Sequence, residues 1–447
     1  MKDKGRDILL SGIILCVLAI LALWAKSLDP GSSWQRAGMA DFTLGFVLLA
    51  AYVSGRLVKT LRMPMISGYV LAGVLAGPFV SGFLTREMTE NLKLFDDLAL
   101  SFIALSAGGT LHVKALGERF RSIFLNVILQ TVIVFSSVFG AVWICSACFG
   151  FTAHLSRLHI ISLAVLLGVV AIARSPSSAI AIISECRASG PFTETVLGVT
   201  IVIDVIIIVL FTLAMTAIQM FFSGGPGDFS TLIALCGEIL VSLVIGALIG
   251  LGISFYISRA GHDLTLFLLL TGFAVTKISQ WLGGFMLANF QLALHLEPLL
   301  ICMSAGFVVQ NFGRAGFQFI KSLDRAALPV FVLFFSLAGA SLDLNALKAC
   351  WPMALFLVVI RGAGIGVAAW TAGRINRDPS PHLHNAWMSY LTQAGVAIGL
   401  AQLAQRQFPE IGIYLTTMVL AAVAVNQLVG PILFKIALER VNEAGTR

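Results

Sequence analysis

One carboxylate, Asp204, lies near the middle of the almost wholly apolar run TVLGVTIVIDVIIIVLFTLAMT. A charge at the centre of a bilayer costs at least about 2.5–3.5 kcal/mol on insertion scales, so an ionisable residue at that depth is a functional candidate. Burial penalises the ionised form of a carboxylate that has no counter-charge. Such a group can hold a proton at one moment and a dehydrated alkali cation at another. We therefore predict that Asp204 binds ions and protons; a structural ion pair between two helices is the alternative.

The preceding apolar run, VVAIARSPSSAIAII, is broken at its centre by Arg174, Ser175, Pro176, Ser177 and Ser178. Proline removes an amide donor and clashes with the preceding helical turn, while serine hydroxyls can bond the freed backbone groups. Backbone opened at membrane depth is tolerated only inside protein or beside a water-filled cavity. The ends of such half-helices offer partial charges to ions. The pattern predicts a binding site here. The alternative is a plain proline kink with an arginine that faces the cytoplasm.

A second polar break occurs at Thr392, Gln393 and Gly395 in the run YLTQAGVAIGLAQL. Arg361 is a permanent cation in the otherwise apolar LFLVVIRGAGIGVAAW, and arginine does not usefully deprotonate. We expect Arg361 to neutralise either a carboxylate or the carbonyl end of a broken helix.

Lys277 lies nearer a helix end, and we expect its side chain to snorkel to the interface.

The elements that must position these residues are membrane-spanning helices. Of the 447 residues, 58% are hydrophobic and only 11% are charged, whereas a soluble chain carries about 25% charged residues. Runs of the ~20 apolar residues that cross a bilayer follow one another along the chain. The sequence predicts an all-α polytopic membrane protein of about fourteen helices, near residues 8–25, 41–59, 65–80, 93–112, 122–149, 158–185, 192–221, 231–257, 264–290, 296–312, 326–345, 350–373, 384–405 and 411–436.

Two interrupted helices in corresponding positions indicate a transporter with inverted repeats and two discontinuous crossover helices. Each break falls in the penultimate span of its half. The predicted organisation is an extra N-terminal helix and loop over residues 1–40, a first repeat over 41–221, a linker helix over 222–262, a second repeat over 263–436 and a short tail over 437–447.

The distribution of basic residues predicts the orientation. Most of the 29 Lys and Arg residues fall in loops that are cytoplasmic if the N-terminus is cytoplasmic. We therefore expect an inner-membrane protein with both termini in the cytoplasm. We also expect the first apolar run to be retained as a helix and not cleaved as a signal peptide. The net charge of +7 is spread over short loops, which suits contact with lipid headgroups and excludes nucleic acid as a partner. Any regulatory domain is expected on a separate subunit.

Five segments, taken in order, resemble the cation/proton antiporter superfamily, especially the bacterial branch of Kef-type and Nap-type antiporters. They include LRMPMISGYVLAGVLAGPFV, LPVFVLFFSLAGASLDL, the helix of Arg361 and LTQAGVAIGLAQLA, and the resemblance covers roughly residues 41–436. It implies a homodimer with a dimerisation domain and a mobile six-helix core that moves like an elevator. By position, Asp204 matches the family's ion-binding aspartate and Arg361 its basic core residue.

The sequence also departs from that family. Ile203 stands where relatives usually carry Asp, Asn or Gln, and Val199 stands where some carry Glu. The crossover of this sequence contains Arg174, whereas many exchangers carry Thr-Asp-Pro there. Because Arg361 then lacks its usual acidic partners, we expect Arg174 or Arg361 to pair with Asp204 in the resting state.

These observations favour exchange of Na⁺ or K⁺ for H⁺ by alternating access, in which cation and proton compete at Asp204 and the exchange is electroneutral. The alkali cation is the one metal expected, and no cofactor is. A sodium- or proton-coupled organic-anion transporter of the same fold is the alternative, because Arg174 would suit an anion; a sensor or channel-like protein is a third class. No nucleophile–base pair or metal cluster in the apolar runs points to an enzyme.

Overall fold

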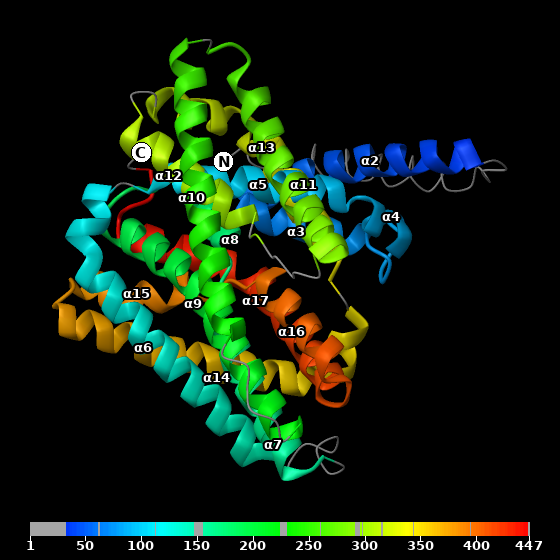
Figure 1. Cartoon of the computed structure of the whole chain (residues 1–447), viewed down its shortest axis with the longest axis vertical. Helices are drawn as coiled ribbons and strands as arrows, with labels where there is room; N and C mark the ends of the chain where they lie inside the picture. The colour runs from blue at the N-terminus through cyan, green and yellow to red at the C-terminus, as the bar shows by residue number, and fades with distance from the viewer. Residues whose placement is uncertain are drawn as a thin grey trace.

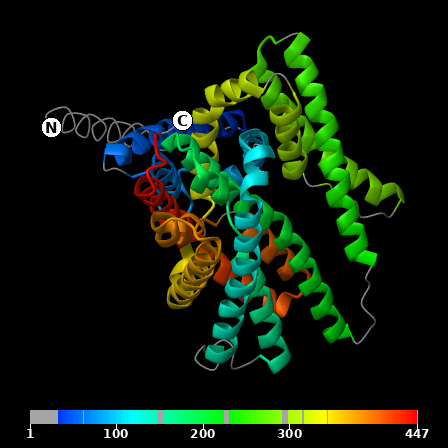
Figure 2. The same cartoon turned by 90° about the vertical axis from the view of Figure 1, so that its left-hand side faces the viewer.

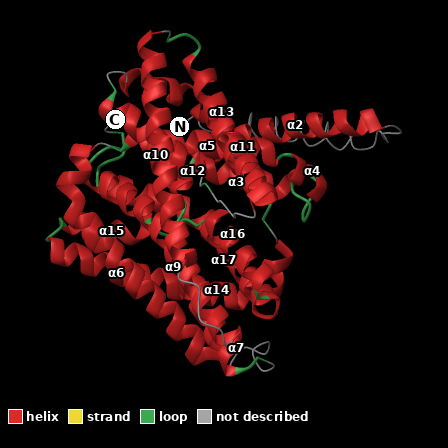
Figure 3. Ribbon diagram, viewed as in Figure 1, coloured by secondary structure: helices red, strands yellow, loops and turns green. Residues whose placement is uncertain are grey.

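The computed structural model describes the chain as a set of packed helices, and no strand is drawn in the described part (Figure 3). It describes residues 33–60, 63–111, 113–146, 155–223, 230–259, 261–290, 296, 298–313, 316–342, 344–393 and 395–445. The helix expected near residues 8–25 lies outside these ranges.

The helices of the first half run from α2 to α10. They are α2 (Ser33–Thr60), α3 (Met65–Ala76), α4 (Arg86–Asn91), α5 (Lys93–Thr110), α6 (Val113–Cys145), α7 (Arg157–Ile172), α8 (Pro176–Cys186), α9 (Pro191–Ser223) and α10 (Ser230–Arg259). The second half contains α11 (Leu264–Phe290), α12 (Pro298–Phe312), α13 (Gly316–Ala340), α14 (Leu344–Asn376), α15 (Ser380–Ser389), α16 (Gly395–Gln407) and α17 (Pro409–Arg440).

Length and composition make many of these helices membrane spans. Eight described segments are long and apolar enough to cross a bilayer, with α7 and α8 together forming one of them, and four shorter apolar helices accompany them. The chain is therefore an integral multi-pass membrane protein, as the composition predicts. The total of about fourteen spans stays a prediction, and so does the inverted relation of the two halves.

The helices pack in two groups. The first group, which we name the scaffold bundle, contains α2, α3, α5 and α10–α13; the second, the core bundle, contains α6–α9 and α14–α17. The scaffold helices α11 to α13 lie toward the top of Figure 1 and the core helices α7, α14 and α16 lie toward its bottom, and Figure 2 shows the molecule from the side. The bundles meet where α8 packs against α3 and α5 and where α17 packs against α3.

Small residues allow close helix packing in the scaffold bundle. Gly73 of α3 lies directly against the backbone of Ser336 in α13, and Gly339 of α13 lies against the backbone of Val70. A β-carbon on either glycine would collide with a main-chain atom, which cannot yield as a side chain can. The scaffold is thus held by reciprocal backbone contact between α3 and α13.

Candidate functional site

Two helices of the core bundle are interrupted at the sequence breaks. Helix α7 ends at Ile172 and α8 begins at Pro176, while α15 ends at Ser389 and α16 begins at Gly395. The backbones of the two breaks meet, since the Ser175 N–H donates to the carbonyl of Thr392 at 3.2 Å. The prediction of two discontinuous helices is confirmed. The alternative of a plain proline kink is wrong at the first break, because the chain leaves the helix there.

Local chemistry explains how the second half-helix starts again after the first break. Ser175 is the N-cap residue of α8, and its hydroxyl accepts from the Ser178 N–H at 3.2 Å. The same Ser175 oxygen lies 2.8 Å from the Ser178 hydroxyl and 3.1 Å from that of Ser177. Pro176 occupies the first helical position, where the missing amide costs nothing. These serines therefore form a hydroxyl cluster at the N-terminal end of α8.

Arg361 of α14 binds the carbonyl ends of both broken helices. Its Nε donates to Ala171 at 2.7 Å and one terminal nitrogen donates to Ala173 at 3.0 Å, both at the end of α7. The other terminal nitrogen donates to Leu391, just past α15, at 2.9 Å. The last carbonyls of a helix have no partner within the helix and carry partial negative charge. Of the two partners expected for Arg361, the structure shows the carbonyl ends.

Arg174 reaches across to the second broken helix and to α6. Its side chain is 1% exposed, and one terminal nitrogen donates to the carbonyl of Tyr390 at 2.6 Å. The other donates to the amide oxygen of Gln130 in α6. The guanidinium also lies over the Tyr390 ring, 4.5 Å from its centroid. Arg174 is consequently buried inside the crossover and does not face the cytoplasm.

The second break is held by amides and by one glycine. Gln393 donates to the carbonyl of Val170 at 3.3 Å and accepts from the Asn426 amide of α17 at 2.8 Å. Thr392 lies directly against Gly430 of α17, where an added β-carbon would lie 3.0 Å from the Thr392 backbone nitrogen. The absence of a side chain at Gly430 lets α17 approach the break.

Asp204 lies on α9, partly buried near the middle of that 33-residue helix. Helix α9 packs against α6, α7 and α8 of the core and against α10 of the scaffold. Among the described contacts, Arg174 and Arg361 bond backbone carbonyls and Gln130. These contacts do not test the expected ion pair of Asp204 with one of the arginines, which stays a prediction. The ion-binding role of Asp204 also stays a prediction.

Lys277 has a partner that the sequence did not indicate. Its ammonium nitrogen lies 2.9 Å from a carboxylate oxygen of Asp97, so it joins α11 to α5 as an ion pair. The sequence could not show this pair because 180 positions separate the two residues. Within the described residues, no group of three or more His, Cys, Asp or Glu could hold a metal ion.

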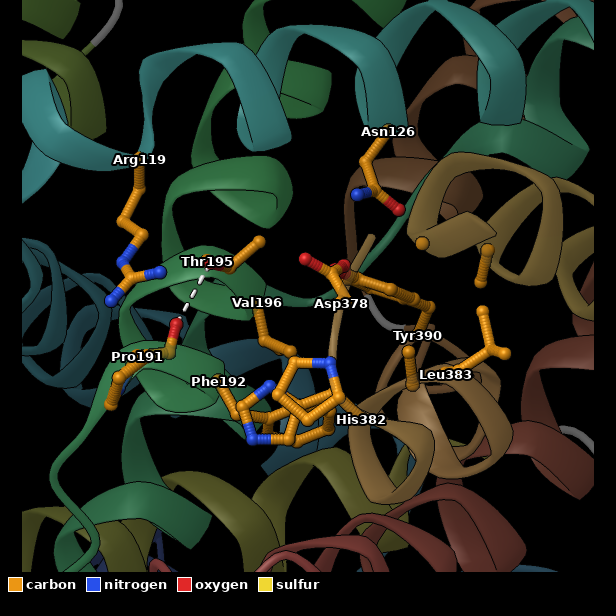
Figure 4. A pocket seen from close by; sticks show the side chains of 14 residues that line it. Arg119, Asn126, Pro191, Phe192, Thr195, Val196, Asp378, His382, Leu383 and Tyr390 are labelled. Carbon is orange, nitrogen blue, oxygen red and sulfur yellow. Dashed lines mark hydrogen bonds between the residues drawn. The ribbon is translucent and has the colours of Figure 1, made fainter. Parts of the chain in front are cut away.

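A polar cavity of about 200 Å³ opens beside the crossover, between α6, α9, the end of α14 and α15 (Figure 4). We name it the vestibule. Arg119, Thr195, Asp378, His382 and Tyr390 are among its lining residues. Figure 4 shows the Asp378 carboxylate directed into the space. A polar cavity of this size can hold several water molecules.

The vestibule is linked to the crossover by amide side chains of α6. Asn126 lines the cavity, and its oxygen accepts from Gln130 at 3.2 Å, which in turn accepts from Arg174. Asp378 also lines the cavity and lies outside the helices. Burial raises the pKa of its carboxyl group above the ordinary value, and the nearby charges of His382 and Arg119 oppose that rise.

Sequence reasoning missed the partners of the arginines. Tyr390 contributes a carbonyl and a ring to Arg174, and Gln130 contributes an amide. A signal for the second was present, because Asn126 and Gln130 stand four positions apart in the apolar run FLNVILQTV and so share a helix face. Nothing in the sequence identified Tyr390, since 216 positions separate it from Arg174.

Comparison with known proteins agrees with this architecture. A family model described as the transmembrane sodium/hydrogen exchanger matches residues 45–440. Two structures of the sodium proton antiporter MjNhaP1 from Methanocaldococcus jannaschii share the fold, each at 17% identity. The structure determined at pH 8 has a TM-score of 0.64 and the match covers 91% of this chain and 97% of that chain. The other, an electron-microscopy structure, has a TM-score of 0.69 and covers 90% and 95%.

A local match to a further protein points the same way. YbaL of Escherichia coli (strain K12), whose name assigns it to the cation/proton antiporters, is 44% identical over 66 residues, which is 14% of this chain and 11% of YbaL. The match thus spans a small part of that protein's length. The matched transporters are not enzymes, and the family model covers most of the chain. The chain belongs to the sodium/hydrogen exchanger family of membrane transporters.

Proposed function

We propose that the protein is a secondary active antiporter that exchanges Na⁺ or K⁺ for H⁺ by alternating access of the core bundle. The cation and the proton compete for Asp204. The observation that carries the proposal is the crossover, where two interrupted helices meet and α9, the helix of Asp204, packs against both halves of the first. Interrupted helices beside an intramembrane carboxylate are the usual site architecture of ion-coupled transporters.

The contacts of Arg361 indicate which side of the crossover would bind the cation. Because its guanidinium occupies the carbonyls of Ala171, Ala173 and Leu391, the C-terminal ends of α7 and α15 are not free to coordinate an ion. The hydroxyls of the cluster at Ser175 remain as uncharged oxygen ligands. We therefore assign the cation ligands to Asp204 and to Ser175, Ser177 and Ser178.

Fixed charges at the crossover support one-for-one exchange. Arg174 and Arg361 are both buried and held by carbonyl groups, and arginine does not release its proton in proteins. Asp204 is then the group whose charge changes with loading. A monovalent cation and a proton change it equally, so the loaded core carries the same charge in both directions. On this basis we propose that the exchange is electroneutral.

The alternative of an organic-anion transporter depends on Arg174, and its contacts weaken that case. Both terminal nitrogens of Arg174 donate to protein groups, and its guanidinium lies over the Tyr390 ring. An anion would have to compete with the Tyr390 carbonyl and the Gln130 amide for the terminal nitrogens. Cation exchange requires no such competition.

The assembly and the orientation belong to the same proposal. We assign the protein to the inner membrane as a homodimer with cytoplasmic termini, since the basic loops favour that orientation. The outer side of α10 exposes large apolar residues, including Leu240, Val244, Leu248, Leu251 and Phe255. Such a surface suits lipid or a second copy. A separate regulatory subunit would contact the cytoplasmic side.

Reconstituted vesicles test the function directly. Purified protein is reconstituted with a pH-sensitive dye inside, and Na⁺, K⁺ or Li⁺ is added outside with the membrane potential clamped. We expect a cation-dependent pH change that is independent of the clamped potential, and its near-complete loss in Asp204→Asn. Each 1.4 kcal/mol added to the barrier of the transport step lowers its rate about tenfold, so the loss of a group that acts in that step lowers the rate by orders of magnitude.

Asp97→Asn is the matched control. It neutralises another carboxylate of a membrane helix, one that is paired with Lys277 away from the crossover. This variant should keep most of the exchange activity. Full cation-dependent flux in Asp204→Asn would reject the mechanism, and uptake of a labelled organic anion without cation-driven proton flux would support the alternative.

A further inference from the structure

The junction between the two bundles contains a carboxylate that the crossover does not use. Glu185 lies at the C-terminal end of α8, in the core bundle. Both of its oxygens accept from the backbone N–H of Met65, at 2.7 and 2.9 Å. Met65 is the first residue of α3, in the scaffold bundle. A core side chain is thus bonded to the scaffold backbone.

Glu185 supplies the side-chain cap that α3 lacks at its N-terminus. The N-cap residue of α3 is Pro64, which makes no side-chain capping bond. The first amides of a helix have no partner within the helix, and the partial positive charge there attracts a carboxylate. Because 120 positions separate Glu185 from Met65, this cap comes from another element instead of the adjacent chain.

One lysine of each bundle lies near the carboxylate. Lys59, near the end of α2, and Lys435 of α17 both interact electrostatically with Glu185. Lys59 belongs to the scaffold and Lys435 to the core, so movement of one bundle past the other would change the distance between these two lysines.

We propose that Glu185 is a latch that holds the core bundle against the scaffold in the conformation described and that opens in each transport cycle. This inference rests on the proposed alternating access. The Glu185 oxygens move with α8 and the Met65 amide moves with α3, so relative motion of the bundles lengthens the bond beyond hydrogen-bond distance. Glu185 is then a positioning residue, which sets the balance between two conformations without touching the ion.

A second carboxylate provides a matched control. Glu443 accepts from the backbone amides of Phe192 and Thr193 at 2.8 and 2.7 Å, and so caps the N-terminus of α9. This is the same chemistry as at Glu185. Here, however, the carboxylate follows α17 and caps α9, and both of these helices belong to the core bundle. Loss of this cap should weaken the core and leave the balance between the bundles as it was.

The test measures that balance by the distance between two spin labels in a cysteine-free version of the full chain. One label replaces Phe120 of α6 and the other replaces Phe317 of α13, which are exposed positions on the core and on the scaffold. Distances are recorded in lipid with Na⁺, with K⁺ and at several pH values. We expect two distance populations, and a change of about 5- to 30-fold in their ratio in Glu185→Gln, the range that one or two kcal/mol produces.

The controls separate a latch from a purely structural cap. Glu185→Asp keeps the charge on a shorter side chain and should change the ratio less than Glu185→Gln does. Glu443→Gln should lower the melting temperature and change the ratio less than twofold. The vesicle assay should show a changed maximal rate for Glu185→Gln at an unchanged half-saturating cation concentration.

An unchanged population ratio in Glu185→Gln would reject the latch, as would a single distance that no ion condition alters. Equal effects of Glu185→Gln and Glu443→Gln would also reject it, because both would then act through stability alone. A different result would reject the proposed function, namely full cation-dependent flux in Asp204→Asn.

Discussion

Replacing Arg361 should separate the two broken helices from the helix that holds them. Arg361→Met keeps the length of the side chain and removes all of its donors. Three hydrogen bonds of 3.0 Å or shorter are lost, and the carbonyls of Ala171, Ala173 and Leu391 are left without them in a buried site. Each buried acceptor left unsatisfied costs about 1–3 kcal/mol, so three carbonyls should cost about 3–5 kcal/mol even near the lower end of that range.

That magnitude predicts a large change in melting temperature. For a unit of about 150–250 residues, 1 kcal/mol shifts the midpoint by about 2–4 °C, so Arg361→Met should melt roughly 6–20 °C lower than the wild type. Arg361→Lys should fall between them, since an ammonium keeps the charge but cannot place a planar fork on both helix ends. Thermal unfolding of the purified protein, followed by size-exclusion chromatography, measures the shift.

Arg374→Met is the control for this series because Arg374 lies on the same helix. Its side chain is exposed and contacts the Trp370 ring, with 5.8 Å between the guanidinium carbon and the centroid. A contact of that kind contributes about 0.5–1 kcal/mol at an exposed site. If Arg361→Met melts within about 2 °C of Arg374→Met, the bonds to the carbonyl ends do not stabilise the crossover, which contradicts this prediction.

Two further changes test the vestibule and the second break. Burial raises the pKa of Asp378 above 3.8, so ionisation opposes folding and Asp378→Asn should be more stable than the wild type above about pH 4, with the gain vanishing at lower pH. Melting temperatures across pH test this, and identical profiles would contradict it. Gly430→Ala should cost about 1–3 kcal/mol and slow exchange, because its β-carbon would meet Thr392. Gly366→Ala, also within a helix but with open space around it, should melt no lower than the wild type.

The sequence predicted the breaks because they are local features. Proline, serines and an arginine in an apolar run disturb a helix wherever the rest of the chain lies, and the structure confirms both interruptions. The role of Arg361 could be narrowed to two partners, but the choice needed the fold. Its partners at Ala171 and Leu391 lie 190 and 30 positions away and contribute backbone carbonyls, which every residue carries.

The capping carboxylates escaped prediction for a different reason. Glu185 and Glu443 lie near helix ends, where charged residues are ordinary in a membrane protein and signal only an interface. Their partners are backbone amides of Met65, Phe192 and Thr193, which no composition distinguishes. Only the packing of the bundles shows that one of these caps crosses the junction and the other does not.

The bonds of the crossover also bear on how the core could move. Arg174, Arg361 and Gln393 all bond groups of the core bundle, and the two breaks bond each other through Ser175 and Thr392. A displacement of the whole core against the scaffold breaks none of these contacts, whereas it must break the bond between Glu185 and Met65. Movement of the core as a rigid unit would therefore keep the site around Asp204 intact in both conformations. A mechanism that unwound the crossover would have to uncover several buried carbonyls in every cycle, at a cost of about 1–3 kcal/mol for each unsatisfied group.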